Sequence, residues 1–445
     1  MRSTTLTALL GLLALALVGC GDEATLPEQA GVGPDPKLPP PRETFIPTVK
    51  IAPAKGWPAG ATPTPAAGLS VGAFASGLDH PRWLYVLPNG DVLVAESNTP
   101  AKPGTPGLQE MIEAFVKRLT GYGVPSANRI TLLRDADGDG SAEIKSTFLQ
   151  GLNSPFGMTL VGHNLYVANT DALLRFPYSE GDTKVAAMPE KLADLPAGSI
   201  NHHWAKNVIA SPDGSKLYVT VGSNSNAAEN GIANETGRAS ILEIDADNGE
   251  ARMFASGLRN PNGLAWQPDS GQLWTVVNER DLLGSDLVPD YMTSVQDGGF
   301  YGWPYSYFGK HLDPRIEPQR PDLVAKAIVP DYALGAHTAS LSLAFYSGKL
   351  LPARYAGGAF ISQHGSWNRN PRSGYKVIFV PFAAGRPAGM PEDILTGFVN
   401  ARGDAQGRPA GVAFDRAGAL LVADDVGNII WRVTPAAAVS ATAAP

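Results

Sequence analysis

Residues 80–97 read HPRWLYVLPNGDVLVAES, and this stretch decides the fold. Two apolar runs flank the tight turn at Pro88, Asn89 and Gly90. An Asn-Gly turn between two strand-like runs is typical of a β-hairpin. The same sequence pattern, a tight turn between two strand-like runs, recurs along the chain in copies that begin at residues 154, 203, 260, 339 and 408. Six repeats of roughly 50 to 80 residues, each sufficient for one four-stranded sheet, predict an all-β chain folded as a six-bladed β-propeller.

The composition agrees with a turn-rich globular protein. The 445 residues include 49 Gly and 38 Pro without a collagen period, and 44% of the chain is hydrophobic while 17% is charged. Such values exclude a disordered chain and favour many turns. The 35 basic residues against 42 acidic ones give a net charge of −7, which excludes an electrostatic grip on nucleic acid.

The N-terminus reads as a targeting segment. Arg2 precedes an apolar run over residues 6–18, which ends in LVG before Cys20. This pattern resembles the lipobox of bacterial lipoproteins, in which the cysteine is acylated. We therefore expect residues 1–20 to be a signal peptide, and a lipid on Cys20 to anchor the exported protein in a bacterial cell envelope, facing the periplasm or the outside. An ordinary secretory signal with a chance cysteine is the alternative.

The rest of the chain divides by composition. Residues 21–67 are rich in Pro, Ala and Gly, which predicts a disordered tether that holds the folded part away from the membrane. Residues 68–435 carry the propeller repeats, and residues 436–445 form an unstructured tail. Two stretches interrupt the repeats. In residues 99–126, apolar residues have the spacing of a short surface helix. Residues 282–331 form a long stretch rich in aromatic residues, which we expect to line a pocket over the central channel.

One acidic motif and several absent motifs bear on the chemistry. Residues 135–140 read DADGDG and resemble the start of an EF-hand loop, but Ser146 stands at the twelfth position where a Glu is needed. We predict a hairpin turn there, with weak cation binding as the alternative. Cys20 is the only cysteine, so the chain can form no internal disulfide and no c-type haem attachment. No H-E-x-x-H zinc motif occurs either.

A set of polar residues stands at the starts of several repeats, where propeller loops converge on the mouth of the channel. Three arginines among them suit an anionic ligand with several carboxylates. The set consists of Arg82, His203, Arg259, Asn260, His364 and Arg408.

Longer motifs extend this set and carry a resemblance. They are NHHW at 201–204, GLRNPNG at 257–263, VNERD at 277–281, GGFYGWP at 298–304, HGSWNR at 364–369 and GRPAGV at 407–412. Together they resemble the soluble quinoprotein sugar dehydrogenases, most closely the sorbosone and pyranose dehydrogenase branch. The likeness covers residues 72–433, nearly all of the predicted propeller.

The resemblance implies an activity and a cofactor. It implies pyrroloquinoline quinone (PQQ) and Ca²⁺ at the channel mouth, and oxidation of a sugar by hydride transfer to the quinone. By motif match, His203 would be the general base that takes the substrate hydroxyl proton. The cofactor would be bound by Arg82, Arg259, Asn260 and Arg408, with His364 beside it. Calcium would be held by backbone carbonyls around Arg280 and Asp281.

Two departures limit the carry-over. His202 stands where soluble glucose dehydrogenases carry Asp, and Ser223 stands where an orienting Asp is expected. Glucose is therefore less favoured as the substrate among aldoses, pyranoses and sorbosone-like sugars, and another group must set the tautomer of His203. Since the chain has no haem motif, electrons would leave to an external cytochrome or quinone.

Two other classes remain open from the residues. A divalent-metal lactonase on a six-bladed propeller would use strand-end polar groups, here Glu96, Asn169, Asn278, Asp424 and Asp425. A non-catalytic propeller that binds glycans or proteins would use the aromatic loop at residues 300–308.

Overall fold

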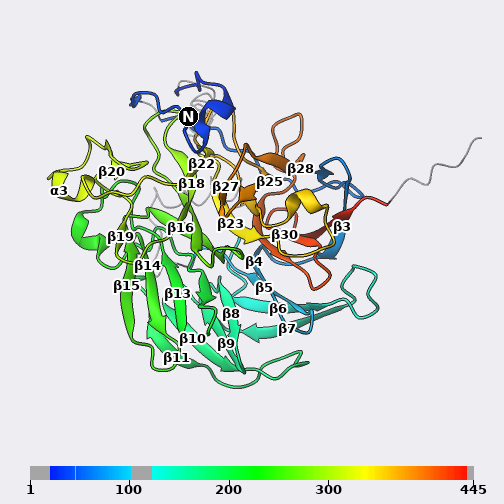
Figure 1. Cartoon of the computed structure of the whole chain (residues 1–445). Helices are drawn as coiled ribbons and strands as arrows, with labels where there is room; N and C mark the ends of the chain where they lie inside the picture. Colours follow the sequence, from blue (N-terminus) through cyan, green and yellow to red (C-terminus); the bar gives the residue numbers. More distant parts are fainter. Residues whose placement is uncertain (1–20, 46, 102–122, 438–445) are drawn as a thin grey trace, which may run out of the picture.

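The strands form a closed ring of six antiparallel sheets in the computed structural model, which describes residues 21–45, 47–101 and 123–437 (Figure 1). The innermost strands of the six sheets contact one another in sequence around a central channel. The predicted all-β class and six-bladed propeller are confirmed. Each of the six repeated phrases corresponds to the first two strands of one blade.

The first three blades follow one another along the chain. Blade 1 holds β4 (Pro81–Val86), β5 (Val92–Glu96), β6 (Arg129–Arg134) and β7 (Ile144–Gln150). Blade 2 holds β8 (Met158–Val161), β9 (Asn164–Ala168), β10 (Ala172–Pro177) and β11 (Glu190–Asp194). Blade 3 holds β12 (Val208–Ala210), β13 (Lys216–Val221), β14 (Ser240–Asp245) and β15 (Ala251–Ser256), with β19 (Gly299–Phe300) at its edge and η2 (Ile232–Glu235) in a loop.

The last three blades gather strands from distant parts of the chain. Blade 4 holds β16 (Asn260–Trp266), β17 (Leu273–Asn278), β18 (Pro289–Ser294) and β22 (Tyr332–Ala336), with β1 (Val32–Gly33) at its edge. Blade 5 holds β23 (Ser340–Phe345), β24 (Ala359–Gln363), β25 (Lys376–Val380) and β28 (Glu392–Thr396), with β2 (Thr64–Pro65) at its edge. Blade 6 holds β29 (Pro409–Phe414), β30 (Leu420–Asp424), β31 (Ile429–Pro435) and β3 (Leu69–Ser76).

Blade 6 closes the ring. Its outer strand β3 comes from the start of the propeller and pairs antiparallel with β31 from the end, from Leu69 opposite Pro435 to Ser76 opposite Ile429. The Ala436 amide then donates to the Gly68 carbonyl at 2.9 Å. The fold is thus closed by backbone hydrogen bonds between the two ends of the domain.

Residues 21–67 do not form the predicted tether. They run along the propeller as η1 (Glu28–Gly31) and the edge strands β1 and β2, which pair with β22 and β28. Ala52 is fully buried, and the Trp57 ring packs edge-on at 5.5 Å against Trp431. The composition of this segment wrongly predicted disorder. The segment has no core of its own, but a few apolar residues and backbone groups attach it to the blades of the propeller.

The inserted stretches have mixed outcomes. The predicted helix at 99–126 falls mostly on residues 102–122, which lie outside the described residues, as do the predicted signal peptide and most of the predicted tail. Residues 282–331 supply β18 and β19 to two blades, and Tyr301 and Tyr307 are buried in the core instead of lining a pocket. The remaining short elements are β20 (Ser306–Tyr307), β21 (His311–Leu312), α3 (Pro321–Val324), η3 (Ala353–Tyr355), β26 (Phe382–Ala383) and β27 (Arg386–Pro387).

The DADGDG motif lies where a hairpin turn was predicted, between β6 and β7. The Asp135 carboxylate accepts hydrogen bonds from the Gly138 amide at 2.7 Å and the Gly140 amide at 2.9 Å. Asp135, Asp137, Asp139 and Glu143 bring carboxylate oxygens within 4.8 Å of one another on the surface. In the part of the chain that the structure describes, no helix is long and apolar enough to cross a membrane.

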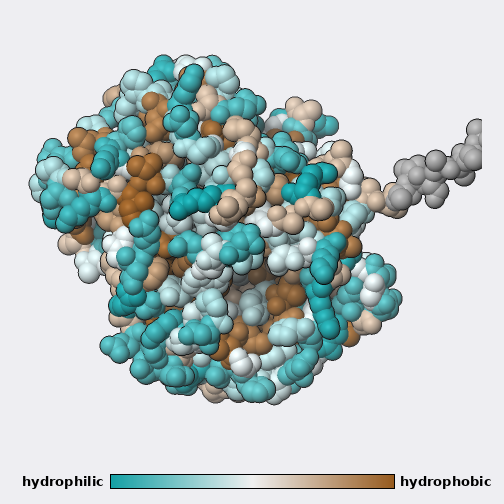
Figure 2. Space-filling model, viewed as in Figure 1, coloured by the Kyte–Doolittle hydropathy of each residue, from teal (hydrophilic) through white to brown (hydrophobic). Residues whose placement is uncertain are grey.

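The central channel has two unlike ends. A cavity of about 360 Å³ lies between the inner strands of all six blades, lined by groups such as Trp83, Met158, Trp266 and Phe345. Figure 2 shows a hollow with hydrophobic residues near the centre of the ring. Trp266 and Phe345 are the last residues of β16 and β23, so the cavity extends to the end of the channel opposite the one where the inner strands begin, which we call the mouth.

Candidate active site at the mouth of the propeller

All the polar residues predicted to meet at the mouth come from loops or strand starts on that side. Arg82, His203, Arg259, Asn260 and Arg408 lie at or just before the first strand of a blade. His364 differs, because it follows β24, the second strand of blade 5. It reaches the same face, since the loop between a second and a third strand returns to the side where the first strand begins. Its assignment to a repeat start was wrong, but its Nε2 lies 3.3 Å from Nη1 of Arg82, which is at the start of blade 1.

His203 has a defined tautomer. Its ring Nδ1 lies 2.8 Å from the Ser223 carbonyl oxygen and 3.0 Å from the Ser223 hydroxyl. A carbonyl oxygen can only accept, so Nδ1 carries the hydrogen and Nε2 keeps its lone pair. Burial, followed by the positive charge of Arg259 and the neighbouring His202, holds the pKa of His203 well below its usual 6.5. The imidazole is therefore neutral and can accept a proton at Nε2.

This geometry answers the departure at position 223. The residue expected there was an orienting carboxylate, yet the backbone carbonyl of Ser223 does the orienting in this chain. The Ser223 hydroxyl meanwhile donates to the Ser225 carbonyl at 2.6 Å, which fixes the loop. Because a carbonyl is neutral, it orients the ring without raising the pKa of His203 as much as a carboxylate would.

Two buried basic residues, Arg238 and Lys206, hold the backbone carbonyl of His203, and neither was among the predicted site residues. Arg238 donates from Nη2 to the His203 carbonyl at 2.9 Å and from Nε to the Gly222 carbonyl at 2.9 Å. Lys206 donates from Nζ to the same His203 carbonyl at 3.3 Å. Burial lowers the pKa of Arg238 to about 10 and that of Lys206 well below 10.5. Both residues lie outside any motif, so only the folded chain reveals them.

Gly222 brings His203 and Asn260 together. A Cβ atom at this position would fall 2.3 Å from Asn260 Oδ1 and 2.5 Å from His203 Cβ. No side chain fits there, so the glycine at the end of β13 allows the two polar groups to approach each other. Gly222 thus places the predicted base next to one of the predicted cofactor-binding residues.

Arg259 is more completely engaged than expected. Its Nε donates to the Asn226 carbonyl at 3.0 Å, its Nη1 to the Glu279 carbonyl at 2.7 Å and to the Asn278 carbonyl at 3.3 Å. Its Nη2 donates to Asn226 Oδ1 at 2.9 Å and lies 3.4 Å from Asp281 Oδ2. The five N–H groups thus have protein acceptors. In this arrangement Arg259 supplies a fixed positive charge next to His203 rather than an open grip for a carboxylate.

One of the predicted calcium ligands, the Asp281 carbonyl, does not fit a cation well. The Arg280 side chain is buried away from the mouth, where Nη1 contacts Asp313 at 2.9 Å. The Asp281 carbonyl already accepts from Arg315 Nη1 at 3.1 Å and from Asn226 Nδ2 at 3.1 Å. A carbonyl facing a guanidinium is a poor ligand for Ca²⁺, because two positive charges would share one oxygen. The structure therefore argues against the Asp281 carbonyl in this role.

The Asp281 carboxylate instead links two blades. Its Oδ1 lies 3.2 Å from His337 Nδ1 and accepts from Asn368 Nδ2 at 2.8 Å. His337 Nε2 lies 3.0 Å from the Gly284 carbonyl, so both ring nitrogens face acceptors. Burial opposes a charge on His337, but the hydrogen bond and charge of Asp281 outweigh it and raise the pKa of this ring. His337 is a functional candidate that sequence motifs missed.

The remaining predicted residues gather around Asp425. His364 Nε2 lies 2.8 Å from Asp425 Oδ2, Arg82 donates to the same oxygen, and His80 Nδ1 donates to the Asp425 carbonyl at 3.0 Å. Burial opposes the negative charge, but His364 and Arg82 outweigh it and lower the pKa of Asp425. Burial lowers the pKa of His80 to about 4, so that ring is neutral.

Arg408 completes this side of the mouth. Its Nη2 donates to the Ala52 carbonyl at 2.9 Å, and its guanidinium lies 5.6 Å from the Tyr375 ring centre. The neighbouring Asp424 accepts from the Trp57 indole at 2.6 Å, and burial raises the pKa of this carboxyl to about 6. The segment 21–67 therefore contributes directly to the position of a predicted site residue.

The charges at the mouth suit an anionic group. Three guanidinium groups, of Arg82, Arg259 and Arg408, stand against the ionised carboxylates of Asp281 and Asp425. Arg82 Nε is also a buried donor with no hydrogen-bond partner among the described residues. A surplus of positive charge and an unused guanidinium donor fit a ligand with carboxylates, such as PQQ.

The alternative metal site does not assemble at the mouth. Glu96 is bound by Arg129 at 2.7 Å and Asp424 by two indoles, so these carboxylates face fixed donors. Within the described residues, the one group of three or more His, Cys, Asp or Glu side chains at metal-binding separation is the surface turn at Asp135. This geometry gives the lactonase hypothesis no support.

Comparison with known proteins finds two matching family models and similar solved structures. Residues 161–364 match the family model "Glucose / Sorbosone dehydrogenase", and residues 322–436 match a model described as TrAA12-like. The holo PQQ domain of pyranose dehydrogenase from Coprinopsis cinerea superposes with a TM-score of 0.68 at 20% identity, over 86% of this chain and 100% of that one.

Two curated proteins match parts of the chain by sequence. An uncharacterized protein of Borreliella burgdorferi is 28% identical over 297 residues, which is 64% of this chain and 77% of that protein. The aldose sugar dehydrogenase YliI of Escherichia coli is 24% identical over 187 residues, 39% of this chain and 48% of that protein. The resemblance to the soluble quinoprotein sugar dehydrogenases is confirmed, since residues 161–364 match the glucose/sorbosone dehydrogenase family model.

Proposed function

We propose that this protein oxidises a sugar in a PQQ-dependent reaction and passes the electrons to an external acceptor, a cytochrome or a quinone. The observation that carries the proposal is the neutral His203 ring, whose Nδ1–H is held by the Ser223 carbonyl and whose Nε2 is free to accept a proton. It stands beside Asn260 and a surplus of guanidinium groups. PQQ, when bound, supplies an acceptor for the hydride that leaves the substrate carbon.

The residues of this chain have distinct tasks in the proposal. His203 Nε2 takes the proton of the substrate hydroxyl as the C–H bond breaks, and Asp425 and Asp281 keep the surrounding arginines in place. Arg82 and Arg408 would bind the cofactor carboxylates, and Arg259 would stabilise the negative charge that develops on reduction. Asn260 and His364 would lie against the cofactor. No step in the proposal runs through calcium, because the Asp281 carbonyl is already bound to Arg315.

The position in the cell is part of the same proposal. Lipidation of Cys20, inferred from the lipobox-like residues before it, would anchor the protein in the bacterial envelope. A pyranose or a sorbosone-like sugar is the substrate class that the resemblance favours, since His202 and Ser223 depart from the glucose dehydrogenase pattern.

The test is reconstitution of the chain from Gly21, which retains Ala52 and Trp57 at the mouth. PQQ is added with and without Ca²⁺, and the absorbance spectrum and dye reduction are followed over a panel of aldoses, ketoses and sorbosone. His203→Ala is expected to bind PQQ and lose dye reduction, while the matched control His163→Ala, on an exposed turn, keeps both. A folded chain that takes up no PQQ would contradict the proposal.

A further inference from the structure

The segment after the predicted lipid attachment site is held at the mouth, not free. The Ser285 amide donates to Asp22 Oδ2 at 2.7 Å, and the Ser285 hydroxyl donates to the Asp22 carbonyl at 2.9 Å. Arg42 pairs with the same carboxylate at 3.1 Å, and Thr48 donates to the Asp22 carbonyl at 3.0 Å. Asp22 is buried, with 8% of its surface exposed, so these hydrogen bonds fix the segment to the propeller.

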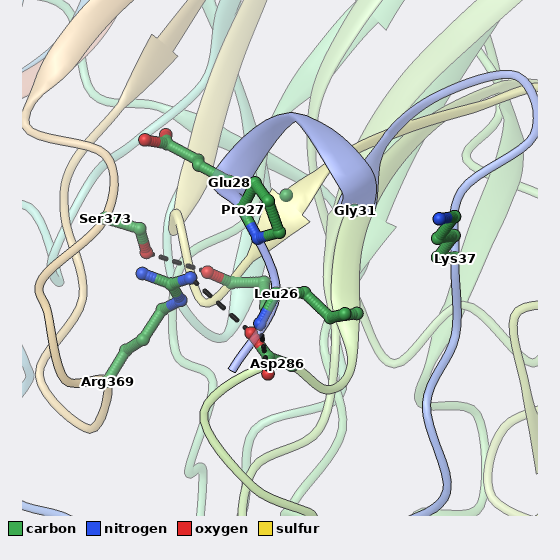
Figure 3. A pocket seen from close by; sticks show the side chains of 10 residues that line it. Leu26, Pro27, Glu28, Gly31, Lys37, Asp286, Arg369 and Ser373 are labelled. Atoms are coloured by element: carbon green, nitrogen blue, oxygen red, sulfur yellow. Dashed lines mark hydrogen bonds and ion pairs between the residues drawn. The ribbon is translucent and has the colours of Figure 1, made fainter. Parts of the chain in front are cut away.

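Neighbouring contacts repeat this attachment. The Leu26 amide donates to Asp286 at 3.2 Å, and Arg369 lies 3.8 Å from the other oxygen of that carboxylate, as Figure 3 shows. The Lys50 amide donates to the Trp367 carbonyl at 2.8 Å. Residues 285–286 and 367–369 belong to the same two mouth loops as Asp281 and His364.

Asp22, two positions after Cys20 in the sequence, is therefore fixed at the mouth. A chain spans at most about 3.6 Å per residue, so a lipid on Cys20 would begin within about 7 Å of the Asp22 backbone. A free tether of residues 21–67 would have allowed the propeller to stand far from a bilayer. The bound segment removes that freedom.

Exposed apolar side chains surround this point. Phe45 is fully exposed, Leu282 is 48% exposed and Trp367 is 40% exposed. Each stands within a few residues of the contacts just described, in the bound segment or in the two mouth loops. Leu282 also has a φ of +70°, which is unfavourable for a leucine. A leucine at this position is therefore explained neither by the backbone conformation nor by packing in the core, since the side chain is exposed.

We infer that this edge of the mouth, defined by Phe45, Val49, Leu282 and Trp367, lies against the lipid bilayer. The inference rests on the lipidation of Cys20 in the proposed function. Exposed Trp, Phe and Leu next to a lipid anchor match the chemistry of a bilayer interface, where an aromatic ring partitions between headgroup and acyl chain. The mouth edge of blades 4 and 5 then faces the membrane, and the apolar channel cavity faces away from it.

Quenching of tryptophan emission by brominated phosphatidylcholine vesicles tests this orientation. The mature chain from Cys20 is isolated with its lipid and reconstituted, and Trp367→Phe is compared with Trp266→Phe, which removes an indole from the opposite end of the channel. We expect brominated acyl chains to quench part of the emission of the unmodified chain. Trp367→Phe should lose that quenched part, and Trp266→Phe should retain it. Equal quenching of the unmodified chain and Trp367→Phe would overturn the inference.

Failure of the anchor and failure of the orientation give different results. Mass spectrometry of the isolated chain reports whether Cys20 carries lipid. If it does not, the proposed anchor fails, and the same chain is coupled through the Cys20 thiol to a maleimide phospholipid. The quenching comparison then still decides whether this edge meets the bilayer: loss of quenching in Trp367→Phe supports it, and loss in Trp266→Phe contradicts it.

Discussion

The Nδ1 atom of His203 lies 2.8 Å from the backbone carbonyl oxygen of Ser223, so the main chain, not a side chain, orients this imidazole. The ring is thereby held with its other nitrogen unprotonated. A backbone acceptor at this position makes the orientation largely independent of the side chain at 223.

The first prediction concerns that side chain. Ser223→Ala keeps the carbonyl and should reduce kcat by less than about tenfold, whereas loss of His203 should cost about 10²–10⁴-fold. Ser223→Asp should raise the pKa of His203, because a carboxylate favours the imidazolium. Steady-state dye reduction as a function of pH measures both. A Ser223→Ala enzyme as inactive as His203→Ala would contradict the role of the carbonyl.

Arg238 is predicted to position His203 and to keep it neutral. Burial, Arg259, His202 and Arg238 all hold the pKa of His203 below 6.5, so the acid limb of kcat/KM in the unmodified enzyme should lie below pH 6.5. Arg238→Met removes one positive charge, and the limb should move upward toward that value. Arg238→Lys keeps the charge and should restore the original limb even if kcat stays low. A limb that is the same in both variants would show that Arg238 is merely structural.

Gly222→Ala tests the approach of His203 to Asn260. The added Cβ would overlap Asn260 Oδ1 at 2.3 Å, so one of the two side chains must move. Misplacement of this kind should lower kcat by about 100-fold. Gly72→Ala is the matched control, because no atom lies within 4 Å of the added Cβ in strand β3. Thermal unfolding of both variants separates a displaced base from a misfolded chain.

Trp57→Phe should show that residues 21–67 stabilise the propeller. Phenylalanine keeps the ring contacts and removes the indole N–H that donates to Asp424 at 2.6 Å. With the Asp424 pKa at about 6, this bond is made to a charged carboxylate at pH 7. Its loss should cost about 1.5–3 kcal/mol there.

The pH dependence of that loss has a definite sign. The folded-state pKa of Asp424 is raised from 3.8 to about 6, so protonation stabilises the folded chain at low pH and this contribution disappears as pH rises through 6. The neutral form depends less on the indole. The difference in Tm between Trp57→Phe and the unmodified chain should therefore shrink from pH 7 to pH 5, and a difference that is constant with pH would refute this account.

Periodic features of the sequence were sufficient for the fold. The hairpin at Pro88 to Gly90 and its five relatives predict the blades because turn chemistry and apolar runs are local properties. The attachment of residues 21–67 was missed, since it depends on single contacts such as Trp57 with Asp424 between positions 367 residues apart. No local pattern reports such a pair.

The site divides in the same way. The site residues His203, Asn260, Arg82 and His364 could be predicted, because each lies in a short motif or repeat that can be recognised in the sequence. The support from Arg238 and the link from Asp281 to His337 were not foreseen. These contacts join loops of different blades, and carbonyl acceptors are invisible in a list of side chains.

The pairing of β3 with β31 sets the order in which the molecule can be completed. Blade 6 needs Leu69 and Pro435 at once, so a growing or translocating chain holds an open ring until its last strand emerges. Until then the apolar faces of blades 1 and 5 that pack against blade 6 are exposed to other chains. With Cys20 as the sole cysteine, no internal disulfide secures the join, so closure depends on strand pairing between chain ends and is slow by its high contact order. The complete ring can therefore form only after the strand β31 has been synthesised.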